Sequence, residues 1–82
     1  MAFDIVIFEL RRLVRKPPED VVAKIKLYYL ARDTEKNGLP DKQAEHQFIE
    51  QLKGITRMTI DKEIVRTLET IIAAIQKKGF VA

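Results

Sequence analysis

The sequence contains no cysteine, no serine and no tryptophan, and its single histidine is His46. The absence of cysteine excludes disulfide bridges and thiolate metal sites. Because serine is absent too, the two commonest nucleophiles of covalent catalysis are missing, and His46 is the only imidazole available as a base. His46 falls on the side of its predicted helix away from Phe48 and Leu52, which predicts an exposed surface histidine. We therefore expect a protein that is not an enzyme and has no cofactor.

Long apolar runs are also missing. The longest run in the second half covers residues 71–75, far short of the roughly 20 residues that cross a bilayer. An earlier run, residues 5–8, follows the acidic Asp4 instead of a basic stretch, unlike the start of a signal peptide. We expect no membrane partner and a cytoplasmic location.

Apolar and charged residues make up most of the chain. Its 82 residues are 46% hydrophobic and 33% charged, which suits one folded domain over residues 1–82. A domain of this size buries only about 60 to 65% of the surface that its unfolded chain exposes. Dimerisation is therefore an expected source of further stability. The net charge of +3 comes from well-mixed signs, so long-range attraction to nucleic acid or anionic lipid is weak.

The first segment is apolar at helical spacing. One helix face carries Phe3, Val6, Ile7, Leu10, Leu13 and Val14. Pro17 and Pro18 end this helix, because proline disfavours helical geometry in the residue before it. A strand over residues 3–10 is the alternative, since the stretch is rich in β-branched and aromatic residues.

A second helix is predicted from about residue 18 to residue 36. Glu19 and Asp20 favour its N-terminus, and Gly38 with Pro40 favours its end. Its apolar residues fall on two sides, one with Val21, Val22, Ile25, Tyr28 and Tyr29 and the other with Ala23, Leu27 and Leu30. A helix that is apolar on two sides is expected to be central, with neighbours on both.

Two more helices are predicted in the second half, from about residue 40 to Gly54 and from about residue 59 to residue 78, with residues 55–58 as a linker. The third helix has a narrow apolar face with Ala44, Phe48, Ile49 and Leu52. The fourth has the clearest amphipathic pattern, with Ile60, Ile64, Leu68, Ile71, Ile72 and Ile75. Together the segments predict an all-α fold, a small bundle of three to four helices with short turns, completed by dimerisation if the core needs it.

Residues 33–38 place oxygen ligands at alternate positions before a glycine, as a calcium-binding EF-hand loop does. The remainder of that loop does not fit. Its twelfth position, which requires a bidentate glutamate, is Ala44, and Pro40 occupies its eighth. An ordinary helix end at Gly38 is the better interpretation, and we expect no metal.

A basic cluster at the end of the first helix is the best candidate for binding nucleic acid. It consists of Arg11, Arg12, Arg15 and Lys16, and four cations can contact several phosphates and release counterions. The same cations also suit the negative end of a helix dipole. A small nucleic-acid-binding regulator is therefore the alternative function.

Surplus apolar residues favour a protein partner. Ile5 and Phe8 fall outside the main apolar face of the first helix, and Tyr28 and Tyr29 offer the large apolar bodies with polar tips that are common at interfaces. We expect a small, non-catalytic interaction or adaptor module that self-associates through its first helix. The sequence-based alternative is that other helices cover Ile5 and Phe8 within the chain.

Overall fold

The computed structural model describes residues 2–15 and 20–80. Its helices are α1 (Phe3–Arg15), α2 (Val21–Asn37), α3 (Lys42–Met58) and α4 (Lys62–Lys78). Within the described residues the protein is thus a small all-α bundle of four helices, as the sequence predicts. Residues 3–10 are helical, so the strand alternative for this segment is wrong.

Three aspartates determine where α2, α3 and α4 begin. The Asp20 side chain accepts the Ala23 N–H at 3.1 Å, and the Asp41 side chain accepts the Ala44 N–H at 2.8 Å. Asp61 accepts two N–H groups of the first turn of α4, at 2.9 and 3.3 Å. Each aspartate therefore satisfies backbone donors that have no partner inside their own helix.

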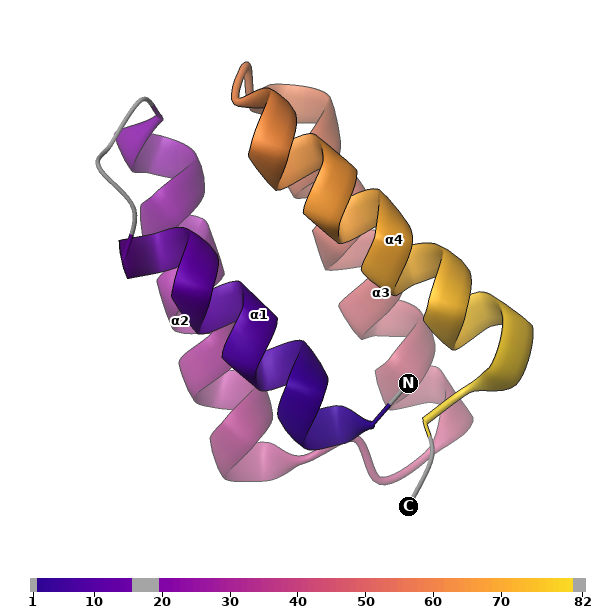
Figure 1. The fold of residues 1–82 in the computed structure, drawn as a ribbon. Coiled ribbons are helices and arrows are strands. Elements are labelled where there is room, and N and C mark those ends of the chain that lie inside the picture. The colour runs from indigo at the N-terminus through magenta and orange to yellow at the C-terminus, as the bar shows by residue number, and fades with distance from the viewer. Residues whose placement is uncertain (1, 16–19, 81–82) are drawn as a thin grey trace.

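The helices form two antiparallel pairs (Figure 1), in which α1 packs most closely on α2 and α3 on α4. Contacts between the two pairs are sparser. The pairs lie closer together at the end where α1 begins and α4 ends, and they diverge toward the end where α4 starts (Figure 1). At the opposite end Phe80 joins them, because its ring lies 5.8 Å from that of Phe3 in α1 and 6.4 Å from that of Phe48 in α3.

The core lies between the two pairs and draws on all four helices. Its buried residues are Val6, Leu10, Leu13, Ala23, Leu27, Ala31, Phe48, Ile49, Leu52, Ile55, Ile64, Leu68, Ile71, Ile72 and Ile75. The radius of gyration is 11.8 Å, close to the roughly 11.7 Å that size scaling gives for a folded chain of this length.

The predicted boundary between the third and fourth helices is wrong. Helix α3 passes through Gly54 and ends at Met58, so residues 55–58 are its last turn and not a linker. Ile55 is 5% exposed, and burying it outweighs the roughly 1 kcal/mol that glycine costs inside a helix. Ile60 was assigned to the apolar face of the fourth helix, but it precedes α4 and is 83% exposed.

Candidate interaction surface

The outer face of α2 is rich in exposed apolar side chains. Five of the nine large apolar residues that are exposed within the described chain lie on it, each with 50 to 56% of its surface accessible. They are Val21, Val22, Ile25, Tyr28 and Tyr29, which we call the α2 stripe. Their spacing of three and four residues places them on one side of the helix.

The other side of α2 supplies the core, through Ala23, Leu27 and Ala31. The prediction that neighbours cover both sides of this helix is therefore wrong within the chain. Helix α2 pairs with α1 and adjoins α3, and no described element remains to cover its outer face. Helix α2 therefore has two apolar sides, and its outer side is exposed to solvent.

Tyr28 and Tyr29 interact with each other within the α2 stripe. Their ring centroids are 5.3 Å apart, with 78° between the ring planes. An edge-to-face aromatic pair of this kind is worth about 0.5–1.5 kcal/mol beyond its buried area. The contact restrains two large side chains that are half-exposed, and so reduces the entropy that they lose on binding.

Helix α1 exposes a smaller apolar pair. Ile5 and Phe8 are 50% and 60% exposed, so the chain does not cover them. Arg11 marks the side of α1 that faces α2, because its Nη2 lies 2.6 Å from Oε1 of Glu35. At about 100° per residue, Phe8 and Ile5 lie about 60° and 120° further round the helix. They are a second exposed apolar patch, on α1.

A groove of about 680 Å³ runs between α2 and α3. Buried and half-buried apolar residues form its floor, namely Leu30, Leu39, Phe48 and Ile55. Ile25 and Tyr29 of the α2 stripe line one side, and Met58 lines the other. From Ile25 to Gly38 the groove follows about 20 Å of α2. The groove and the α2 stripe are therefore one continuous apolar surface.

Gly54 also lines the groove, in the middle of α3. A Cβ placed on this residue would meet no other atom within 4 Å, apart from its chain neighbours and its own helix backbone. Packing inside the chain therefore does not require a glycine here. Its effect is to lower the α3 wall of the groove.

Two opposite charges lie on the α2 side of the groove. Lys26 and Asp33 are both exposed and both line it. Neither forms an ion pair with any residue that the structure describes. They are seven residues apart, which separates their backbones by about 10.5 Å and keeps them from pairing with each other.

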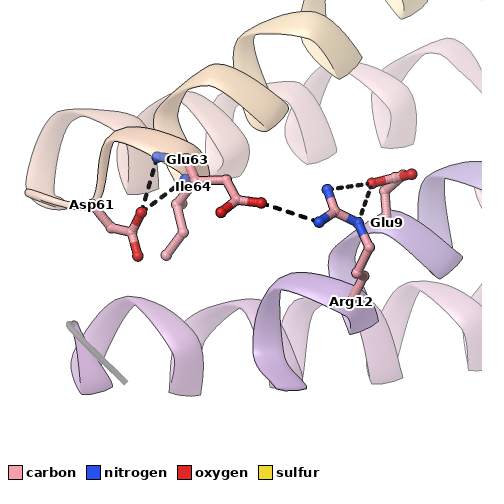
Figure 2. Close-up of polar contacts among 5 residues, drawn as sticks. All are labelled: Glu9, Arg12, Asp61, Glu63 and Ile64. Atoms are coloured by element: carbon pink, nitrogen blue, oxygen red, sulfur yellow. Dashed lines mark hydrogen bonds and ion pairs between the residues drawn. The ribbon is translucent and has the colours of Figure 1, made fainter. Parts of the chain in front are cut away.

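The basic cluster of α1 is partly neutralised by carboxylates. Arg12 donates through Nε to Glu9 at 2.9 Å and through Nη1 to Glu63 of α4 at 3.1 Å (Figure 2). Arg11 is paired with Glu35 of α2. Arg15 is exposed in the last turn of α1. Lys16, the fourth member, lies outside the described residues.

The two cations at the end of α4 do not extend this cluster. Lys77 and Lys78 are in the last turn of α4, at the end of the bundle where Phe80 meets Phe3 at the start of α1. The cluster is at the opposite end of α1, beside the first turn of α4. Both lysines are therefore far from the cluster along the bundle. By contrast, Lys62 and Arg66 lie in the first two turns of α4, on the same end of the bundle as the cluster.

The remaining sequence candidates are His46 and the turn at Gly38. The side chain of His46 is 74% exposed, as expected, and its Nε2 lies 4.0 Å from a Glu50 oxygen. Gly38 ends α2 by donating its N–H to the Thr34 carbonyl at 2.8 Å, as the helix-end interpretation predicts. In residues 2–15 and 20–80, no three His, Asp or Glu side chains gather where they could hold a metal ion.

No family model, no curated protein and no solved structure matches the chain. In the described part of the chain, no helix is long and apolar enough to span a membrane. The surface itself is therefore the basis for inferring function.

Sequence reasoning named two residues of the α2 stripe, Tyr28 and Tyr29, as interface candidates, and it did not find the groove. The signal for the other three was present, because all five were recognised as one apolar face. That face was assigned to the interior, since the pattern of one helix does not reveal how many neighbours it has. The groove depends on the angle between α2 and α3, which no local pattern encodes.

Proposed function

We propose that this protein is a small, non-catalytic protein–protein interaction module that binds a second copy of itself through α2. The observation that supports this proposal is the α2 stripe, with five large apolar side chains on one helix face, each about half exposed. Single exposed apolar residues are ordinary, whereas a contiguous patch of this kind is typical of a contact surface.

The size of the stripe fits a weak dimer. Moving one half-exposed apolar side chain into an interface contributes on the order of 1 kcal/mol. The stripes of two copies then contribute roughly 10 kcal/mol, against an association cost of about 4–15 kcal/mol. The stripe alone then contributes at most about 6 kcal/mol net, a dissociation constant of tens of micromolar, so further contacts at its edges decide the affinity.

The exposure of Ile5 and Phe8 supports a second, smaller contact surface on α1. The sequence-based expectation gave this helix the main role. The proposal now gives that role to α2, because it exposes five large apolar side chains against two on α1. A cytoplasmic location is part of the proposal, since a chain without cysteine suits a reducing compartment.

Binding of nucleic acid by Arg11, Arg12, Arg15 and Lys16 is the alternative. The ion pairs that Arg11 and Arg12 form with glutamates weigh against it, because phosphates would have to compete with these existing pairs. The separation of this cluster from Lys77 and Lys78 also limits the number of phosphates in reach.

Light scattering during size exclusion tests the proposal when it is run at low and high salt and at several protein concentrations. We expect a dimer that persists or strengthens at high salt, because salt favours apolar burial and screens charge. Absorbance at two ultraviolet wavelengths reveals bound nucleic acid, since the chain has no tryptophan and only two tyrosines. A monomer at every concentration contradicts the proposal. A complex with nucleic acid that dissociates at high salt supports the alternative.

A further inference from the structure

The groove between α2 and α3 has the shape that a helix requires. Its floor is apolar and about 20 Å of α2 forms one side, which corresponds to a helix of 13 or so residues laid along it. Gly54 lowers the opposite wall, and a glycine permits close approach by another backbone. An amphipathic helix seated in a groove is a common mode of protein recognition.

We infer that the occupant of this groove is α2 of a second copy, running antiparallel to the first α2. The inference rests on the proposed self-association and specifies its geometry. Ile25 and Tyr29 belong to both the α2 stripe and the groove, so a helix in the groove also touches the stripe. Around a two-fold axis the contact is reciprocal, and each copy fills the groove of the other.

Charge complementarity favours a second copy over an unrelated helix. Lys26 and Asp33 lie symmetrically about the midpoint between Tyr29 and Leu30. When two α2 helices run antiparallel around that midpoint, Lys26 of each copy faces Asp33 of the other. Two ion pairs form in this way between groups that have no partner within the described chain. A parallel arrangement would instead place like charges opposite each other.

The area of this contact fits a weak dimer. The α2 stripe offers roughly 500 Å² per copy and the groove lining adds to it, a contact below the ~800 Å² per partner that is typical of stable specific complexes. Lys26 and Asp33 are at the rim of the contact. There they determine orientation and register more than affinity.

A charge exchange tests the antiparallel arrangement. Lys26→Asp places two like charges together at each rim, and so does Asp33→Lys. We expect each single variant to weaken the dimer about ten-fold or more, and the double variant Lys26→Asp/Asp33→Lys to return to within about three-fold of the wild type. Lys62→Asp and Glu69→Lys, which change exposed charges on α4, are the matched controls and leave the dissociation constant unchanged.

The variant Ile25→Asp separates this inference from the proposed function. If Ile25→Asp dissociates the dimer while the charge variants have no effect, α2 self-association stands and the antiparallel groove arrangement is overturned. Single variants that weaken the dimer without rescue by the double variant overturn it as well. A wild-type protein that is monomeric at all concentrations overturns both proposals. Circular dichroism of each variant checks whether the helices remain folded.

Discussion

Arg12 of α1 donates a 3.1 Å hydrogen bond to Glu63 in the first turn of α4, and so links the two helix pairs at the end where they diverge (Figure 2). Phe80 links them at the other end, between Phe3 and Phe48. The two links differ in kind. Both side chains of the ion pair are 40% exposed, whereas the aromatic contact adjoins the core.

A double-mutant cycle on Arg12→Ala and Glu63→Ala measures what the ion pair contributes. We expect a coupling free energy of about 0.2–1 kcal/mol that decreases as salt is added, because water and ions screen a pair this exposed. The measurement is the free energy of unfolding by urea for the wild type, both single variants and the double variant. A coupling of several kcal/mol would show that the pair is far more desolvated than its exposure indicates.

Leu68 and Ile60 give a matched test of where the core lies. Leu68 is fully buried in α4, whereas Ile60 is 83% exposed just before that helix. Leu68→Ala should lower the free energy of unfolding by about 2–5 kcal/mol, since it leaves a cavity. Ile60→Ala should change it by no more than about 0.5 kcal/mol. Both are measured at one fixed protein concentration, because dimerisation adds to apparent stability. Equal effects of the two variants would contradict this core.

Gly54→Ala tests the interpretation of the glycine inside α3. Because the added Cβ has open space around it, we expect the variant to raise the free energy of unfolding by about 0.5–1 kcal/mol. Thermal unfolding monitored by circular dichroism gives the change in Tm. The exposed residue Ala73 of α4 supplies the reverse control, since Ala73→Gly should lower stability by a similar amount. At concentrations where the protein is monomeric, a loss of stability in Gly54→Ala would mean that this position is more crowded within the chain than the structure shows.

The helices themselves were largely predictable from sequence, for reasons that are local. Asp20, Asp41 and Asp61 each satisfy backbone donors within three residues of themselves, and the apolar spacing identifies the buried face of each helix. The end of α3 is not predictable in the same way, because Gly54 has the local features of a stop signal. Whether it acts as one depends on the burial of Ile55, which is a tertiary property.

The candidate surface was only partly predictable, because it depends on distant residues. The ion pairs of Arg11 and Arg12 join positions 24 and 51 residues apart, and no spacing rule connects them. Lys26 and Asp33 are visible in the sequence, but their position on one groove wall is a consequence of how α3 crosses α2. The pattern of α1 leaves open whether other helices cover Ile5 and Phe8, and the structure leaves both exposed.

Asp20 connects stability to pH. Hydrogen bonds from the Ala23 N–H and then from the Thr59 hydroxyl hold the pKa of Asp20 below its ordinary value of 3.8. A carboxyl whose pKa is lower in the folded state stabilises the protein above the unfolded pKa, and this contribution is lost as pH falls through the folded pKa. Asp20→Asn keeps a good helix cap but does not titrate.

We therefore expect the wild type to be more stable than Asp20→Asn at about pH 6 and to lose this advantage progressively as the pH falls below 3.8, the ordinary pKa of the carboxyl. The measurement is Tm against pH for both proteins. The difference between the two curves isolates Asp20 from the other carboxyls, which titrate in both. Curves that remain parallel over the whole range would show that Asp20 has the same pKa in the folded and unfolded states.

The last prediction compares the two apolar surfaces directly. Ile25→Asp with Tyr29→Asp should convert the dimer to a monomer, because it buries charge at the centre of the proposed contact. The variant should remain helical, since both side chains are about half exposed in the single chain. Ile5→Asp with Phe8→Asp should leave the dimer intact, because these residues belong neither to the α2 stripe nor to the lining of the groove.

Solution mass by light scattering and helix content by circular dichroism are the two readouts. Ile60→Asp is the matched control, because it places the same charge on an exposed isoleucine outside both surfaces. If the α1 variant dissociates the dimer and the α2 variant does not, the main contact lies on the first helix, as the sequence pattern alone suggests. If either double variant loses its helices, the two substituted residues stabilise the folded monomer more than their exposure in the single chain indicates.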